Sequence, residues 1–150
     1  MLERSMTETG NELSKAQLLL KRTFRGNFIS IGILFPAIGL LMEGIFPYIG
    51  ILIGVISILV AYSKLVDVLI QYISQRRGKK YMQFSSVLAP ALLSVVTLLL
   101  PILMWVAWRP SIPLTWSQNL TTLLSLIVGI FNIVLLALNV YTIFRDRSNP

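Results

Sequence analysis

Two large apolar blocks, separated only by the basic segment 76–80 (RRGKK), constrain the fold of this chain more than any other feature. Each block holds two stretches long enough to cross a bilayer, which takes about 20 apolar residues in a helix. Charged residues make up only 13% of the 150 residues, roughly half the share that is usual in soluble proteins. The sequence therefore predicts an all-α, polytopic membrane protein whose four transmembrane helices form two antiparallel hairpins.

The lysines and arginines predict the orientation of these helices. Arg76, Arg77, Lys79 and Lys80 form the strongest basic cluster between spans, and such clusters stay on the cytoplasmic side. With this segment inside, every Lys and Arg except Arg109 falls at or near a cytoplasmic helix end. We therefore expect both chain termini in the cytoplasm and the four basic side chains in contact with anionic lipid head groups.

The expected domain boundaries follow from the apolar runs. A single transmembrane domain is expected at 27–150, with spans over residues 27–46, 49–74, 82–108 and 119–143. Residues 1–26 form a polar leader, which we expect to be poorly ordered or weakly helical up to Leu13. From there an apolar helical face begins, bordered by basic residues, that comprises Leu13, Ala16, Gln17, Leu20 and Phe24. It fits an amphipathic helix lying at the membrane interface or a charged flank that only sets topology.

Small residues recur at helical spacing along the first two spans. Gly32 and Gly39 share one face of the first span, and Gly50 and Gly54 share one face of the second. Such stripes let membrane helices approach closely. If the connecting turn lies at residues 46–50, Gly39 should lie near Ser57. Gly129 belongs to a similar face of the fourth span, and all five glycines are candidate packing positions.

Three charged residues lie within or beside the apolar runs, where ionisable groups are functional candidates. Glu43 is close to the outer helix end, where it can reach head groups or pair with Arg109. Lys64 and Asp67 lie one turn apart near the cytoplasmic end of the second span. We interpret them as an interfacial ion pair, and the alternative is a gate or a cytoplasmic docking site.

Two amides lie on one face of the fourth span. Asn132 is the most central polar side chain of the sequence, and Asn139 follows it two helical turns later. An amide in that position must find a partner, so an inter-helix hydrogen bond is the favoured interpretation for Asn132. A polar pathway lined by the same residues is the alternative.

Missing residue types exclude several functions. The chain has no Cys and no His, which removes thiolate chemistry, imidazole bases and the commonest metal ligands. It also has no glycine-rich phosphate loop and few acids, so we expect no enzyme, no metal and no cofactor. The net charge of +7 is concentrated at the ends of apolar runs, which favours lipid over nucleic acid as its partner.

The expected function is therefore that of a small integral membrane protein, in the plasma or inner membrane, acting through helix packing. It would be an accessory subunit or effector in a homo-oligomer or a larger membrane complex. In size and topology the outline resembles phage holins and the small accessory proteins of ATP-synthase operons, and small multidrug transporters have an acid in the first span, as Glu43 is here. The alternative function is an oligomeric pore, a holin-like channel or a small transporter.

Overall fold

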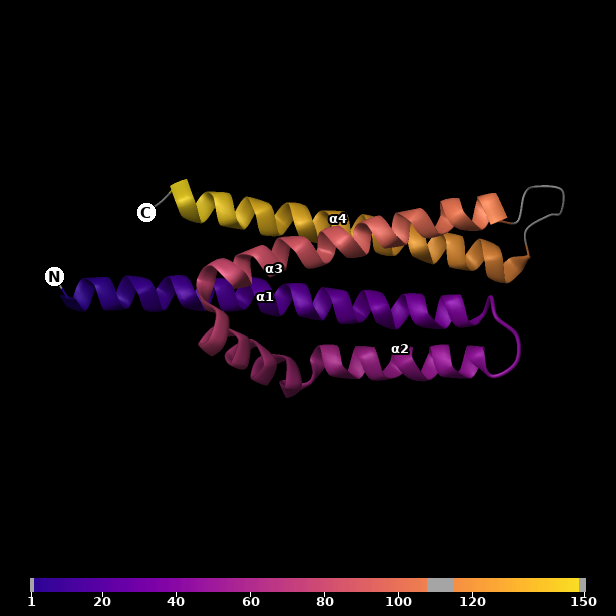
Figure 1. Cartoon of the computed structure of the whole chain (residues 1–150), viewed down its shortest axis with the longest axis horizontal. Helices are drawn as coiled ribbons and strands as arrows, with labels where there is room; N and C mark the ends of the chain where they lie inside the picture. Colours follow the sequence, from indigo (N-terminus) through magenta and orange to yellow (C-terminus); the bar gives the residue numbers. More distant parts are fainter. Residues whose placement is uncertain (1, 108–114, 149–150) are drawn as a thin grey trace.

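The computed structural model describes the backbone of residues 2–107 and 115–148, which form four α-helices and no strands. The predicted all-α class is confirmed. The helices are α1 (Leu2–Gly39), α2 (Phe46–Tyr62), α3 (Lys64–Ala107) and α4 (Trp116–Ser148). Helix α1 lies in the middle, with α2 and residues 64–77 of α3 on one side and the rest of α3 and α4 on the other (Figure 1). Helices α2 and α4 do not touch each other in this arrangement.

The turn of the first hairpin lies at residues 40–45, several residues earlier than expected. Gly44 adopts φ 77°, a left-handed conformation that glycine reaches without steric cost. Pro47 lies in the first turn of α2, where its missing N–H needs no partner. The first span therefore ends at Gly39 rather than at residue 46, and Pro47 belongs to α2 instead of the turn.

The second span does not continue to residue 74 as expected, because the helix breaks at Ser63. The Ser63 hydroxyl donates to the carbonyl of Val60 at 2.9 Å and accepts from the backbone N–H of Leu65 at 3.2 Å. Its backbone is extended, with ψ 161°. One serine thus ends α2 and supports the start of α3, a local effect that apolar periodicity does not reveal.

Helix α3 contains a sharp corner at Gly78, where φ is 71° and ψ is 176°. Residues 76, 77, 79 and 80 are helical, so the basic segment is not the open loop that the sequence suggested. The chain reverses direction at this corner (Figure 1). We call residues 64–77 the short arm of α3 and residues 79–107 the long arm.

The leader is not a separate interfacial helix in the structure, because α1 is continuous from Leu2 to Gly39. Its apolar face packs against protein instead. Ala16 and Leu20 are buried in a cluster with Val66 and Ile70 of the short arm and Met82 of the long arm. The short arm folds back along α1 and covers this face, for which a position at the membrane interface was one of the two interpretations.

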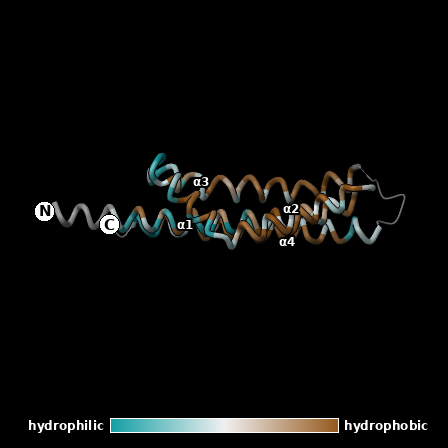
Figure 2. Tube along the Cα trace, turned by 90° about the horizontal axis from the view of Figure 1, so that it is seen from below, coloured by the Kyte–Doolittle hydropathy of each residue, from teal (hydrophilic) through white to brown (hydrophobic). Residues whose placement is uncertain are grey.

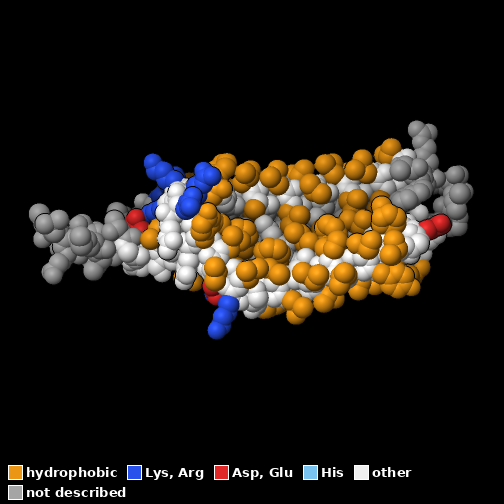
Figure 3. All heavy atoms as spheres, turned by 60° about the horizontal axis from the view of Figure 1, so that its bottom comes forward, with side chains coloured by type: hydrophobic (Ala, Val, Ile, Leu, Met, Phe, Trp, Pro, Cys, Tyr) orange, Lys and Arg blue, Asp and Glu red, His pale blue; other side chains and the backbone are white. Residues whose placement is uncertain are grey.

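The polarity of the bundle is inverted relative to that of a water-soluble protein. The inward face of α2 consists of Gly50, Gly54, Ser57 and Ala61. Many large apolar side chains face outward instead, and these five are 59–65% exposed: Leu52, Leu59, Val96, Leu103 and Ile130. Orange apolar side chains cover the middle of the face seen in Figure 3, and the hydrophilic residues gather toward the end that carries both termini (Figure 2).

Among the described residues, two helices are long and apolar enough to cross a membrane. They are Lys64–Met104 and Trp116–Ser148, and only 22% and 33% of their most apolar windows are buried. A core helix of a soluble protein would bury most of such a segment. Helix α2 is also apolar but shorter, with 17 residues.

Candidate functional site

A line of polar residues runs along the buried face of α4, and we call it the polar seam. Its members recur at intervals of four and seven residues, and all four are completely buried: Thr121, Ser125, Asn132 and Asn139. Val128 and Leu135 complete a stripe that follows the spacing of a coiled-coil interface. The seam therefore faces the other helices rather than the apolar outer surface.

Asn139 joins three helices. Its amide nitrogen donates to the Thr23 hydroxyl of α1 at 2.8 Å and to the Ser86 carbonyl of α3 at 2.7 Å. Its amide oxygen accepts two hydrogen bonds from Arg22, at 2.7 Å from Nη2 and 3.2 Å from Nε. All the hydrogen-bonding atoms of this buried amide are satisfied, and one of its partners is charged.

The other seam residues bridge pairs of helices. Asn132 donates to the Ser30 hydroxyl of α1 at 2.9 Å, and Thr121 donates to the Ala37 carbonyl at 2.9 Å. Ser125 donates to the carbonyl of Thr97 on the long arm. Asn132 also bonds within α4, but its amide oxygen is buried without a hydrogen-bond partner. Asn132 thus leaves one of its hydrogen-bonding atoms unsatisfied, whereas Asn139 leaves none.

The glycines that the sequence selected lie at close helix contacts. A Cβ atom added to Gly50 would lie 2.5 Å from the Phe35 carbonyl oxygen, and one added to Gly54 would lie 2.8 Å from the Gly32 carbonyl oxygen. Gly39 faces Gly50 rather than the neighbourhood of Ser57, because the turn comes earlier than expected. At Gly129, an added Cβ would meet the Leu98 side chain at 2.7 Å.

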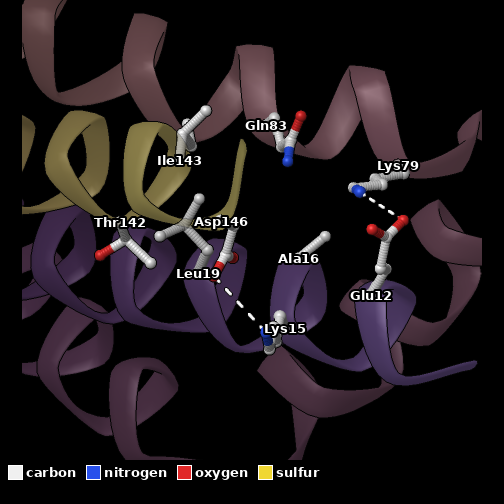
Figure 4. A pocket seen from close by; sticks show the side chains of 9 residues that line it. All are labelled: Glu12, Lys15, Ala16, Leu19, Lys79, Gln83, Thr142, Ile143 and Asp146. Carbon is white, nitrogen blue, oxygen red and sulfur yellow. Dashed lines mark hydrogen bonds and ion pairs between the residues drawn. The ribbon is translucent and has the colours of Figure 1, made fainter. Parts of the chain in front are cut away.

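Ion pairs stabilise the end of the bundle that carries both termini, which we call the hydrophilic end (Figure 2). Figure 4 shows Glu12 of α1 pointing toward Lys79 and Lys15 pointing toward Asp146 of α4, at 2.6 Å and 3.5 Å. Exposed pairs of this kind contribute little individually, about 0–1 kcal/mol. Together they hold the ends of α1, α3 and α4 in register, and they occupy Lys79, which we had expected to contact lipid.

The other charged candidates are distributed as follows. Glu43 lies exposed in the turn between α1 and α2, outside any helix, while the proposed partner Arg109 lies outside the described residues. Lys64 is exposed at the first position of α3. Asp67 pairs with Lys21 of α1 at 2.5 Å, not with Lys64, because the break at Ser63 places the short arm alongside α1.

The remaining three basic residues of the segment 76–80 lie on the surface of the hydrophilic end. The Arg76 guanidinium lies 5.2 Å from the centre of the Tyr72 ring, and that of Arg77 lies at the same distance from Tyr81. Lys80 lines a groove between α3 and α4. Stacking on tyrosines holds both arginines while their N–H groups stay available to anions.

Asp67 predicts a pH effect on stability. The hydrogen bond from Lys21 holds the pKa of the Asp67 carboxyl below its usual value. The stabilising contribution is therefore present above the unfolded-state pKa and is lost as the pH falls through the lower folded-state pKa. We expect Asp67→Asn to weaken the acid-induced fall in Tm, measured between neutral and acidic pH. Glu43→Gln, at the opposite end of the bundle, is the control. An equal fall in Tm with decreasing pH for Asp67→Asn and wild type would contradict the assignment.

Among the side chains of the described residues, no group of three or more His, Cys, Asp or Glu could hold a metal ion. The partners of the seam on the other helices, Arg22, Thr23, Ser30 and Ser86, were not selected from the sequence. Thr23 and Ser30 lie seven residues apart, as do Asn132 and Asn139, and this matching interval was the available signal.

Comparison with known proteins does not assign the chain to a family. No family model, no curated protein and no solved structure matches it. The function is therefore argued from the polar seam, the hydrophilic end and the apolar surface.

Proposed function

We propose that this chain is a four-span integral membrane protein that acts through helix packing, as an accessory subunit or effector of an oligomeric membrane complex. One observation carries the proposal. The polar side chains of the interior bond to one another within a single chain, and large apolar side chains cover the outside. A protein of this kind presents an apolar surface to lipid and to partner helices, and it keeps its polar groups for internal structure.

The helix dimensions support a bilayer setting. The 17 residues of α2 extend about 25 Å, close to the minimum needed to cross the hydrocarbon core. The apolar half of α1 runs beside α2, and the long arm of α3 and α4 are longer still. The short arm and the hydrophilic end would then lie at the cytoplasmic surface, where Arg76, Arg77 and Lys80 meet anionic head groups.

The orientation gives the first test. The short arm and the turn between α1 and α2 lie at opposite ends of the bundle (Figure 1). Gln75 and Met42 are exposed representatives of these two ends, and neither bears a charge that affects topology. We expect Gln75→Cys to react with a membrane-impermeant thiol reagent only from the cytoplasmic side, and Met42→Cys only from outside. Since the chain has no native Cys, the labelling is unambiguous. Labelling of both positions from one side would disprove the four-span arrangement.

The proposed role in a complex is tested by its mass in mild detergent. The chain, extracted from its native membranes, should migrate on a native gel well above the 16.9 kDa of one protomer plus its detergent. A protomer-sized particle under conditions that preserve other membrane complexes would contradict the proposal.

A pore is the second candidate, because the Asn132 amide oxygen is buried without a partner and could line a polar pathway. Liposomes carrying the purified protein separate the two candidates. A scaffold gives no ion flux above that of empty liposomes. A pore gives flux whose ion preference changes in the Lys64→Glu variant, since charged rings set selectivity.

A further inference from the structure

A groove between α1 and α4 combines an apolar floor with a basic mouth. It holds about 570 Å³, and its apolar lining consists of Leu18, Ile29, Phe131, Val134, Leu135 and Leu138. Lys21, Arg22 and Arg25 line the same groove, and we call these three residues the basic mouth. The groove opens on the outer surface of the bundle, so a membrane component can enter it sideways.

The charge of the basic mouth is only partly neutralised. Lys21 is paired with Asp67. Arg22 bonds only to the neutral amide of Asn139, which uses part of its five N–H donors. Arg25 has no acid within ion-pair distance among the described side chains, and its Nε is buried without a hydrogen-bond partner. Arg25 also acts on Asp67 through its charge, but that carboxylate is already paired with Lys21. N–H donors of both guanidinium groups are thus left to bind an anion.

Arg22 and Arg25 also lie deeper than cations nearer the end of the bundle, such as Lys15, Lys79 and Arg145. Arg22 is level with Asn139, which lies six residues before Arg145, or about 9 Å along α4. Arg25 lies one helical turn further inward. An arginine at such a depth in a bilayer is costly unless an anion or water reaches it. The phosphate of a lipid is the anion that arrives at this depth together with an apolar chain.

The shape of the groove depends on Gly26. An added Cβ there would lie 2.7 Å from the Leu135 side chain and 3.5 Å from the ring of Phe131. The glycine allows α1 to approach α4 closely just inside the mouth. The floor beside Arg22 and Arg25 is formed mainly by apolar side chains of α4, which match an acyl chain rather than a polar ligand.

We propose that the groove between α1 and α4 is a binding site for one anionic phospholipid, whose phosphate is held by Arg22 and Arg25 and whose acyl chain lies on Phe131 and Leu138. The inference rests on the membrane placement proposed above. Resistance of the protein to alkaline extraction from membranes tests that placement separately, so failure of the lipid site alone can be distinguished from failure of the membrane placement.

The test is native mass spectrometry of delipidated protein in neutral detergent, titrated with phosphatidylglycerol, phosphatidylcholine or inorganic phosphate. We expect one phosphatidylglycerol to bind preferentially. Arg25→Gln should weaken that binding at least about tenfold, as expected for a hydrogen bond to a charged group. Leu138→Trp, which fills the groove from a half-exposed position, should weaken it similarly. Arg147→Gln, at an exposed arginine in the last turn of α4 that does not line the groove, should not.

Three outcomes would overturn the site. Equal losses in Arg25→Gln and Arg147→Gln would mean that the lipid is held by general surface charge. Equal affinity for inorganic phosphate and phosphatidylglycerol in this titration would mean an anion site without a place for the acyl chain. Dissociation of an oligomer by Leu138→Trp, independent of added lipid, would mean that a second copy of the chain occupies the groove.

Discussion

Replacing Gly50 by Ala should destabilise the protein by about 1–3 kcal/mol, although the change adds a single methyl group. The new Cβ would lie 2.5 Å from the Phe35 carbonyl oxygen and 3.2 Å from the Gly39 Cα. Both neighbours belong to the backbone, so no side-chain rotation can relieve the contact. The two helices would have to move apart along the whole hairpin and lose the packing that holds α2, whose other helix contacts are confined to α3.

Gly10→Ala is the matched control for this substitution. Like Gly50, Gly10 lies in a helix, but unlike Gly50 it is exposed, and no atom lies within 4 Å of an added Cβ. Removing a glycine from a helix interior stabilises it by about 0.5–1 kcal/mol, so this variant should gain stability. Unfolding in mixed micelles, followed by circular dichroism, measures both changes. If Gly50→Ala is as stable as wild type, α1 and α2 do not pack at the distance described here.

The sequence predicted the small-residue stripes of this hairpin but not their register. A turn at residues 46–50 would have placed Gly39 near Ser57, whereas Gly39 faces Gly50. The difference arises because both ends of the turn were ambiguous. Pro47 suits a turn or the first turn of a helix, and only the left-handed backbone of Gly44 decides between them. Periodicity identifies a face but gives little information about where a hairpin closes.

The break between α2 and α3 and the corner inside α3 were harder still to predict from the sequence. Lys64 and Asp67 continue the helical face of α2, and nothing in their spacing reveals the cap formed by the Ser63 hydroxyl. The basic segment was expected to be a loop because of its charge and Gly78. Only that glycine leaves the helical conformation, since Arg76 and Arg77 are compatible with helix on either side of a corner.

The polar seam could be predicted on α4 but not on its partners. Asn132 and Asn139 are conspicuous in an apolar run, and both are fully buried. Arg22 was counted as one cation among several in a basic flank. Its pairing with Asn139 depends on α1 being continuous, so that residues before the first apolar run lie beside α4. Because the sequence does not reveal the path of α1, Arg22 was interpreted only as a cation that sets topology, although it bonds to the buried Asn139.

Replacing Asn139 by Leu should therefore cost more than the same change at Asn132, although both amides are completely buried on one face of α4. At Asn132 the variant loses the bond to Ser30 and removes an unpaired amide oxygen. Inter-helix hydrogen bonds in membrane proteins average about 0.6 kcal/mol, with a maximum of about 1.7, and we expect a loss in that range. At Asn139 the variant also loses two bonds to a guanidinium, and bonds to charged groups are worth about 1.5–3 kcal/mol.

The excess at Asn139 can be assigned to Arg22 with a double-mutant cycle. Arg22→Met removes the charge and keeps an unbranched apolar stem, so the double variant lacks both partners instead of leaving one unpaired. We expect the two substitutions to be non-additive by about 1 kcal/mol or more, within the usual range for contacting residues. The cycle is measured in a neutral detergent without anionic lipid, so that lipid binding by Arg22 does not contribute. Full additivity, or equal costs at Asn132 and Asn139, would mean that the guanidinium does not bind the amide. Helices α1 and α4 would then be held together chiefly by the apolar and small residues of this face of α4, such as Val128 and Leu135.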